Sequence, residues 1–305
     1  MVRHLTIGGE LEVSRLGFGA MRITGAGVWG QPDDPEVARQ LLRRAHELGV
    51  NLIDTSDSYG PHVSEELIAE ALHPYPEGLV IATKGGLTRQ GPSRMSPNGH
   101  PDYLRSACEG SLRRLRLDAI DLYQLHAVDR DVPYAESVGA LAELQREGKI
   151  RHVGVSNVTL AELATAREIA TIASVQNRYN VADRRFGDVL AECERAGIAF
   201  LPSVPLDAGD VDVRSGPLER IAAKRGVSRA QVALAWLLHA SPVLAPIPGT
   251  ATQAHLEANV AAADLELDAN DMAQLDRVRP SPKTIKRRLR ARAGRTARSL
   301  GLRRG

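Results

Sequence analysis

Short apolar segments alternate with longer amphipathic segments along most of the chain. The short segments are typical of buried strands, and the longer ones, whose apolar residues recur every three or four positions, predict helices. The strand-like segments lie at residues 16–19, 51–54, 80–83, 120–125, 150–155, 172–176, 198–201 and 244–247. The helix-like segments between them include residues 35–48, 160–170, 186–196, 228–239 and 252–262. Eight strands alternating with helices predict a (β/α)8 TIM barrel.

Local signals add detail at both ends of this predicted barrel. Asp34 precedes Pro35, which is the combination expected at a helix N-terminus. Residues 5–7 and 11–13 flank a glycine-rich turn and predict an N-terminal β-hairpin that plugs the barrel floor. Residues 85–101 are rich in glycine and proline, and they predict a long loop that overhangs the mouth.

Ionisable side chains follow three of the strand-like segments. Residues 51–60 (NLIDTSDSYG) end their apolar part at Asp54 and place Tyr59 on the polar loop that follows. The next two strand-like segments stop at Lys84 and at His126. Because parallel strands in a closed barrel present their C-terminal ends on one face, we expect the four side chains to converge.

The four groups together describe the reduction of a carbonyl compound. A phenol has a pKa near 10 and is a poor proton donor at neutral pH. An ammonium about 4 Å away favours phenolate by at most about 4 kcal/mol at an effective dielectric of 20, so we expect Lys84 to make Tyr59 a usable acid. Asp54 would keep Lys84 charged and oriented. His126 would hydrogen-bond the substrate oxygen as it gains negative charge.

Each of these residues also has a purely structural interpretation. Asp54 could cap a turn and Tyr59 could be an ordinary loop aromatic. Lys84 could be solvated, and His126 could be a core histidine whose polar atoms are satisfied. The joint pattern favours the catalytic interpretation, because chance would have to place four complementary groups at the ends of successive strands.

The order and spacing of several motifs resemble the aldo/keto reductase family. These motifs are LGFGAM at 16–21, the segment 51–60, Lys84, DLYQLH at 121–126, GKIRHVGVSN at 148–157, QNRYN at 176–180 and IPGT at 247–250. The resemblance spans about residues 5–280. It implies a (β/α)8 barrel that transfers hydride from a nicotinamide cofactor to aldehydes and ketones.

The resemblance also implies a cofactor site on the later strands. Gly17 and Gly19 lack the third glycine of a dinucleotide fingerprint, which argues against a doubly wound nicotinamide domain. In the family, residues matching Ser156, Asn157 and Gln176 bind the carboxamide, although Ser-Asn after a strand is also an ordinary helix cap. The residues near Gly249 would open a helix whose N-terminus favours phosphate. The cofactor-binding set implied by the resemblance is Met21, Asp54, Ser156, Asn157, Gln176, Leu206, Gly249, Thr250, His255 and Asn259.

Three positions depart from the family pattern. Ser203 stands where an aromatic ring would stack on the nicotinamide, so cofactor affinity is expected to suffer. Gly249 and His255 stand where many members have a basic pair for the adenosine phosphate. Family habit still implies NADPH, with NADH left open. Ala127 stands where an indole often lines the pocket, with Trp29 as its substitute, so we expect a roomier site. The expected substrate pocket is formed by Trp29, Tyr59 and His126.

The last 25 residues of the chain are strongly basic. Residues 281–305 contain ten Lys or Arg and no Asp or Glu, so residues 1–280 carry 29 basic against 37 acidic groups, a formal charge of −8. Apolar residues at near-helical spacing would suit a basic amphipathic helix on an anionic surface. We favour a disordered, solvated tail, because blocks of like charge usually behave that way. The expected organisation is a barrel at 1–280 and a tail at 281–305.

Length and composition fit a soluble globular protein, and the sequence gives no sign of a membrane or nucleic-acid-binding protein. A length of 305 residues fits one barrel of about 250 residues and a tail. Prolines interrupt the most apolar stretch, residues 232–247, so no transmembrane segment is predicted. The N-terminus lacks an apolar leader, and Cys108 and Cys193 are far apart, which predicts buried thiols in a reducing cytoplasm. No zinc signature and no fold motif for nucleic-acid recognition occur, so neither a metal nor nucleic acid is expected.

Two hypotheses for function follow. The leading one is NADPH-dependent reduction of a small-molecule aldehyde or ketone to an alcohol, with the proton from Tyr59. The alternative, prompted by Ser203, is a non-catalytic nicotinamide-cofactor sensor or docking module that acts through the basic tail. Retention of all four catalytic-type residues favours the enzyme.

Overall fold

Seven parallel strands form a curled sheet at the centre of the computed structural model, which describes residues 3–206 and 216–278. The strands are ordered β11-β10-β9-β8-β5-β4-β3, and every neighbouring pair is parallel. Their bounds are β3 (Phe18–Gly19), β4 (Leu52–Asp54), β5 (Val80–Gly85), β8 (Ile120–Leu125), β9 (Ile150–Ser156), β10 (Ile172–Gln176) and β11 (Ala199–Phe200). Their C-terminal ends therefore share one face of the molecule.

Residues 243–248 close the ring between β11 and β3. A parallel bridge joins Phe200 to Leu244 on one side. On the other side, hydrogen bonds run from Gly17 N to Pro246 O at 3.0 Å and from Gly19 N to Pro248 O at 3.3 Å. The predicted strand at 244–247 is thus in its expected place, but it is not a regular strand. The reason is that proline has no N–H: Ala245 donates to the Phe200 carbonyl on the β11 side, whereas Pro246 and Pro248 on the β3 side can only accept.

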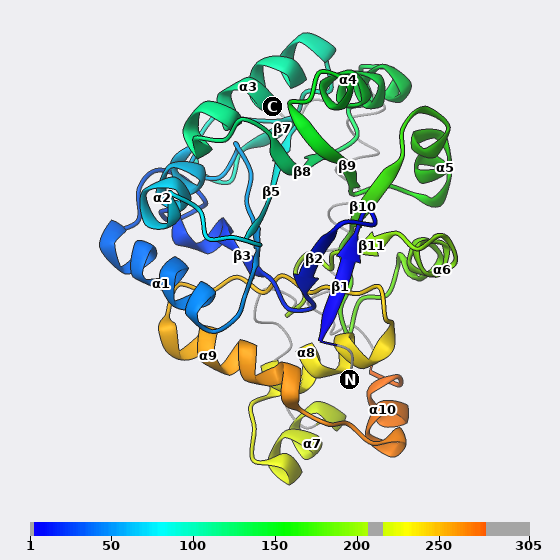
Figure 1. The fold of residues 1–305 in the computed structure, drawn as a ribbon. Helices are drawn as coiled ribbons and strands as arrows, with labels where there is room; N and C mark the ends of the chain where they lie inside the picture. The colour runs from blue at the N-terminus through cyan, green and yellow to red at the C-terminus, as the bar shows by residue number, and fades with distance from the viewer. Residues whose placement is uncertain (1–2, 207–215, 279–305) are drawn as a thin grey trace, which may run out of the picture.

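Helices surround the strands (Figure 1). The outer layer consists of α1 (Pro35–Glu47), α2 (Val63–Leu72), α3 (Pro101–Leu115), α4 (Tyr134–Arg146), α5 (Leu160–Ile169), α6 (Gly187–Ala196), α8 (Arg229–Ala240) and α9 (Gln253–Ala261), with 3-10 turns η1 (Ala20–Ile23) and η3 (Ala262–Asp264). Beyond α8 lie α7 (Pro217–Arg225) and α10 (Ala269–Leu275). The Asp34 carboxylate accepts the N–H groups of Glu36 and Val37 and caps α1 as predicted. The predicted (β/α)8 barrel is confirmed.

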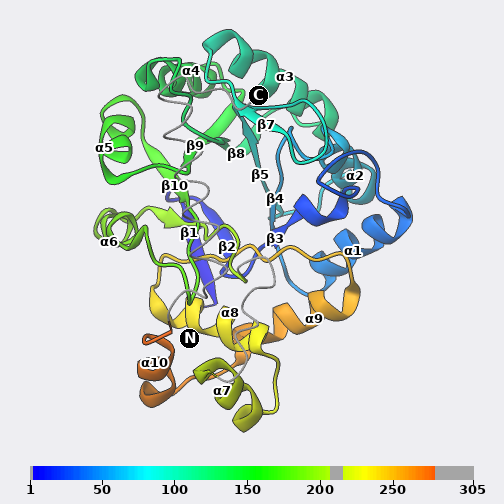
Figure 2. The same cartoon turned by 180° about the vertical axis from the view of Figure 1, so that it is seen from behind.

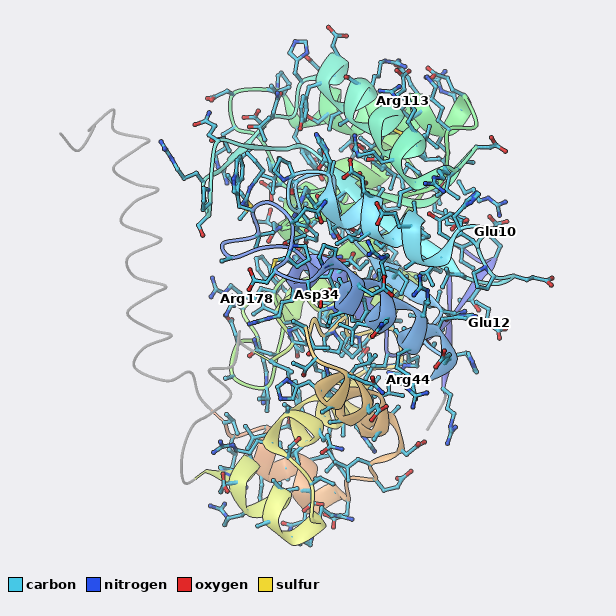
Figure 3. The ribbon with its side chains drawn as sticks, turned by 90° about the vertical axis from the view of Figure 1, so that its left-hand side faces the viewer. Glu10, Glu12, Asp34, Arg44, Arg113 and Arg178 are labelled. Carbon is cyan, nitrogen blue, oxygen red and sulfur yellow. The ribbon has the colours of Figure 1, made fainter. Side chains whose placement is uncertain are left out.

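The N-terminal hairpin closes the floor of the barrel. It is formed by β1 (His4–Ile7) and β2 (Leu11–Ser14), which pair antiparallel. Ile7 and Val13 are fully buried and pack in one cluster with side chains that line the barrel, including Leu52 and Leu122. Glu10 and Glu12 of the hairpin lie at the opposite end of the molecule from Arg178, which follows β10 (Figure 3). The predicted plug is confirmed, and the strand ends that carry the ionisable groups face away from it.

The segment predicted as a loop at residues 85–101 contains a second hairpin, so that prediction was incomplete. β6 (Leu87–Arg89) and β7 (Met95–Pro97) pair antiparallel, and β7 lies beside α3 and α4 when the barrel is seen from behind (Figure 2). The Tyr103 hydroxyl donates to the Leu87 carbonyl at 3.2 Å, and the Ser137 hydroxyl donates to the Gly99 carbonyl at 2.6 Å. These bonds from neighbouring helices hold the hairpin over the mouth.

Three further predictions concern cysteines, membranes and the tail. Cys108 and Cys193 are free and buried, as predicted. In the described ranges, no helix has the length and apolar character needed to span a membrane, and no cluster of three His, Cys, Asp or Glu is arranged to bind a metal ion. The tail predicted at 281–305 lies outside the described residues.

Candidate active site

Lys84 and Asp54 form a buried ion pair at the mouth of the barrel. They lie near the ends of the adjacent strands β5 and β4, and the Nζ of Lys84 is 2.7 Å from Oδ1 of Asp54. The same Nζ donates to the carbonyl of Thr55 at 2.6 Å. Burial works to lower the pKa of Lys84, but the Asp54 carboxylate and then Tyr59 raise it, and the net direction is upward. Lys84 is therefore an ammonium.

The other carboxylate oxygen of Asp54 is held by two amides. Gln176 Nε2 donates to Oδ2 at 2.8 Å, and Gln124 Nε2 donates to it at 3.4 Å. Gln124 was not among the predicted site residues. Because side chains alternate along a strand, its position two residues before His126 on β8 was the signal that it faces the same way.

Tyr59 lies on the loop after β4 with its ring against Lys84. The Nζ of Lys84 is 5.2 Å from the centre of the ring, and Tyr59 is only 8% exposed. Burial raises the pKa of Tyr59, and the Lys84 ammonium opposes this shift without reversing it. The Lys84 ammonium thus acts on the Tyr59 pKa in the expected downward direction, but burial outweighs it and the net shift is upward. The reason is that water is excluded from both partners, which disfavours the phenolate.

His126 follows β8 and completes the group of four. Its ring meets the Tyr59 ring edge-on, with centres 5.9 Å apart, and its Nδ1 is 3.0 Å from the Ser56 hydroxyl. Burial, and then the charge of Lys84, hold the pKa of His126 well below its ordinary value. The imidazole is therefore neutral, and because Nδ1 faces Ser56, Nε2 is the nitrogen available to a substrate.

The three residues that match the family's carboxamide contacts lie next to this group. The Ser156 hydroxyl at the end of β9 donates to the carbonyl of Gln176 at 2.8 Å. The side-chain amide of Asn157 donates to the carbonyl of His126 at 3.0 Å. Gln176, as described above, also bonds Asp54. The three residues predicted to bind the carboxamide and the predicted catalytic residues are thus parts of one polar cluster.

The residues predicted to bind phosphate lie where 243–248 leads into α9, beside η1. A Cβ built on Gly249 would lie 2.7 Å from the carbonyl oxygen of Gly19 and 3.7 Å from Cγ of Arg22. Thr252 caps α9 by accepting the N–H of His255 at 3.4 Å. The remaining predicted residues of this end are the buried Thr250 and Asn259 and, on η1, the exposed Met21. Arg22 was not predicted, although its charge and its place beside the glycine-rich first strand were visible.

The predicted pocket residue Trp29 lies next to the Tyr59 loop. A parallel bridge joins Trp29 to Gly60, the indole is 37% exposed, and the Arg89 guanidinium lies 5.8 Å from the ring centre. Ser203 bridges to Arg178 beyond β10, and Leu206 is the last residue before the undescribed segment 207–215. The bridge to Gly60 thus places the backbone of Trp29 beside the loop that carries Tyr59.

Ser56 and Asp57 were not singled out from the sequence, although both lie within the quoted segment 51–60. Both are buried, and Ser56 donates to Oδ1 of Asp57 at 3.1 Å. Short polar residues after a strand are usual in turns, so the sequence carried no signal that Ser56 reaches His126 or that Asp57 bonds Ser56.

Comparison with known proteins places the whole barrel in one family. The Aldo/keto reductase family model matches residues 15–280. An uncharacterized oxidoreductase of Schizosaccharomyces pombe is 46% identical over 88% of this chain and 87% of its own length. Pyridoxine 4-dehydrogenase of Escherichia coli is 44% identical over 88% of this chain and 96% of its own length.

A solved structure agrees with these sequence relatives. The aldo-keto reductase from Klebsiella pneumoniae in complex with NADPH superposes with a TM-score of 0.77 at 29% identity, covering 92% of this chain and 97% of that one. The match covers most of both chains, so it does not rest on a single motif. The chain belongs to the aldo/keto reductase family.

Proposed function

We propose that the protein reduces aldehydes or ketones to alcohols with NADPH, and that Tyr59 gives the proton to the carbonyl oxygen. The observation that carries the proposal is the position of Lys84, whose Nζ lies 2.7 Å from the Asp54 carboxylate and 5.2 Å from the centre of the Tyr59 ring. A buried ammonium beside a phenol stabilises the negative charge that the phenol acquires when it loses its proton. As a member of this family the chain is an oxidoreductase, which favours the enzyme over a non-catalytic sensor.

Tyr59 is proposed to act as the acid in reduction. Its raised pKa keeps the phenol protonated at neutral pH, so the proton is present when the carbonyl oxygen gains charge. An alkoxide is a far stronger base than a phenolate, so the transfer is downhill even with a raised phenol pKa. Lys84 stabilises the phenolate that remains, and Asp54 holds Lys84 in place through the 2.7 Å contact.

His126 is proposed to orient the substrate. Its neutral ring offers Nε2 to the carbonyl oxygen while Nδ1 stays with Ser56. One N–H aimed at the oxygen stabilises the charge that develops there, and such a donor contributes about 100- to 1000-fold to the rate in other enzymes. The edge-on contact between the His126 and Tyr59 rings supports the proposal that both donors act on the same oxygen.

The residues present fit a nicotinamide dinucleotide. Ser156, Asn157 and Gln176 offer hydroxyl and amide groups beside Asp54 and His126, as a carboxamide requires. At the other end, the N-terminus of α9 and the Arg22 side chain offer backbone amides and a positive charge suited to phosphate. When bound, the cofactor supplies the hydride that is added to the carbonyl carbon. The choice of NADPH is supported by the Klebsiella relative in complex with it.

The test is an assay of the purified protein with a panel of aldehydes, ketones and alcohols. NADPH and NADH are compared as reductants, and NADP with pyridoxine is included in the oxidation direction because of the relative named pyridoxine 4-dehydrogenase. We expect aldehyde-dependent oxidation of NADPH at neutral pH. Absence of turnover with every carbonyl, in a protein that binds NADPH, would contradict the proposal.

A further inference from the structure

The Ser56 hydroxyl lies between the Asp57 carboxyl group and the His126 ring and has a single proton to donate. Its Oγ is 3.1 Å from Oδ1 of Asp57 and 3.0 Å from Nδ1 of His126. The same oxygen accepts the backbone N–H of Ser58 at 3.1 Å, and it also lies 2.9 Å from the Ser58 hydroxyl and 3.3 Å from the carbonyl of Lys84. Ser56 therefore connects a buried carboxyl group to the histidine of the proposed site.

The protonation state of Asp57 decides which way this chain of hydrogen bonds runs. An ionised carboxylate is the stronger acceptor, so Ser56 then donates to Asp57. Its oxygen is left to accept a hydrogen bond from Nδ1–H of His126, and Nε2 of the neutral ring carries no proton. A protonated carboxyl instead donates to Ser56, which then donates to Nδ1, and the ring proton resides on Nε2. Only the second arrangement gives His126 a donor toward the substrate.

The surroundings of Asp57 allow both states near neutral pH. Burial, and then the nearby Glu65 carboxylate, raise the pKa of Asp57 to about 7. The Tyr103 hydroxyl reaches its Oδ2 at 3.5 Å. The titratable and charged groups around it are Tyr59 on the same loop, His62 and Glu65 at the N-terminal end of α2, Lys84 from β5, Arg89 from β6, Tyr103, Arg113 and Arg114 from α3, and Tyr123 from β8. Arg114 pairs with Glu65 at 2.7 Å. This cation offsets part, but not all, of the upward effect of the Glu65 carboxylate on the pKa of Asp57.

Asp57 also lines a polar cavity of about 390 Å³. It is lined by Asp57 and Ser58 on the site side and by residues of β6 and α3 on the other, including Arg89 and Arg113. Arg113 belongs to the outer helical layer (Figure 3), so this cavity lies outside the ring of strands. Asp57 thus stands between the cavity and the histidine.

We propose that Asp57 is a positioning residue that selects the tautomer of His126 through Ser56. This role rests on the proposed function: in the form of the protein that is competent for reduction, Asp57 is protonated. When that form ionises, the Asp57 proton passes to the Ser56 oxygen, the Ser56 proton passes to Nδ1, and Nε2 releases its proton to water. One proton leaves the chain of three groups, and the imidazole stays neutral throughout.

The direct test is nitrogen NMR of the full-length protein labelled with 15N-histidine, without cofactor or substrate. The His126 signals are assigned by their loss in His126→Asn. Between pH 5.5 and pH 8.5, we expect the proton of the neutral ring to move from Nε2 to Nδ1 with a midpoint near 7. If the wild-type protein keeps the same His126 tautomer across this range, the proposal is overturned without any variant.

Two variants then test whether Asp57 controls the His126 tautomer. In Asp57→Asn the side chain does not titrate, so the proton of the neutral His126 ring should stay on one nitrogen over the whole range. In Ser106→Ala, which alters the same cavity without touching Ser56, the wild-type transition should remain. A transition in Asp57→Asn with an unchanged midpoint would overturn the assignment to Asp57. These spectra test the relay even if no carbonyl is turned over, so failure of the relay and failure of the proposed function are distinguishable.

The kinetic consequence is a pH profile. For wild-type reduction, kcat/KM should fall above pH 7 by about tenfold per unit, up to the roughly 100-fold expected for one lost donor. The profile of Asp57→Asn should be flat between pH 6 and pH 9. A fall of the same size and midpoint in Asp57→Asn would contradict the role given to this carboxyl group.

Discussion

The Nζ of Lys84 lies 2.7 Å from Oδ1 of Asp54, and neither side chain is more than 3% exposed. A buried ion pair costs desolvation of both charges, so it is weak evidence for a contribution to stability. Two adjacent strands nevertheless place these residues side by side at the mouth, against the ring of Tyr59. We therefore interpret the ion pair as the interaction that keeps the Lys84 ammonium beside the Tyr59 phenol.

Removal of one partner should destabilise the protein more than removal of both. Lys84→Met leaves the Asp54 carboxylate buried without its cation, and we expect the free energy of unfolding to fall by about 3 to 5 kcal/mol. The double variant Asp54→Asn with Lys84→Met should recover at least about 1 kcal/mol, because the uncompensated charge is gone. Urea unfolding measures both. Neither variant should reduce carbonyls.

A matched control for this pair lies on the surface. Lys149 also contacts two carboxylates, Glu109 at 2.8 Å and Glu147 at 2.9 Å, but it is 31% exposed. Lys149→Met should cost no more than about 1 kcal/mol and should leave turnover unchanged. Equal losses of stability for the two lysine variants would refute the distinction drawn between the buried and the exposed pair.

The floor of the barrel should affect stability without affecting turnover. Ile7 is fully buried in the hairpin that plugs the end opposite the strand ends. Ile7→Ala should lower the free energy of unfolding by about 2 to 5 kcal/mol. The kcat of the folded variant, assayed well below its unfolding temperature, should stay close to the wild-type value. A large loss of kcat in a fully folded sample would show that the plug does more than fill the floor.

Asp57 should make the protein less stable as pH rises. Its folded-state pKa of about 7 is above the ordinary 3.8, so the folded state retains a proton that the unfolded state has lost. Stability associated with this group is present below about pH 4 and is lost as pH rises through 7. Asp57→Asn should therefore gain stability relative to wild type between these values, by at most about 4 kcal/mol. Thermal unfolding at pH 5 and pH 8 measures the gain, and a larger gain at pH 5 would reverse the predicted sign.

Arg22 should contribute to cofactor binding. It lies beside Gly249, where the family often has a basic residue that this chain lacks. Hydrogen bonds to charged groups contribute about 1.5 to 3 kcal/mol, so Arg22→Ala should raise the Kd of NADPH about 10- to 100-fold. Fluorescence titration of NADPH measures this. Arg43→Ala, on the exposed face of α1 where Arg43 contacts Glu36, is the control and should bind NADPH like wild type. An unchanged Kd in Arg22→Ala would remove Arg22 from the phosphate site.

Much of the fold was predictable because hydrophobic alternation and strand-end chemistry are local signals. The ends of β4, β5 and β8 carry Asp54, Lys84 and His126, and the topology of a parallel barrel brings such ends together. The segment at 244–247 is apolar like a strand, but its prolines prevent a regular ladder, and the hairpin within 85–101 depends on contacts from α3 and α4. Contacts of this kind are tertiary, so no local pattern announces them.

The pKa shifts and hydrogen bonds of the site were less predictable than the identity of its principal residues. The direction of the shift in the Tyr59 pKa depends on burial outweighing the nearby ammonium, and burial of a loop residue cannot be read from its neighbours in sequence. The same holds for Ser56, whose side chain reaches His126 across 70 positions of sequence. The strand-end pattern and the family resemblance identified the four principal residues, and the alternation along β8 could have identified Gln124, whereas Ser56 and Asp57 emerged only from their distances.

The central claim is that the Tyr59 hydroxyl delivers the proton to the substrate oxygen. The most direct measurement is single-turnover oxidation of NADPH by an aldehyde at pH 7 in Tyr59→Phe, with Tyr75→Phe as the control because the Tyr75 hydroxyl bonds the Leu115 carbonyl instead. General acid catalysis contributes about 100- to 10,000-fold. We therefore predict a loss of at least about 100-fold in Tyr59→Phe, with the Kd of NADPH nearly unchanged and the control fully active. Turnover by Tyr59→Phe at the wild-type rate would contradict the account.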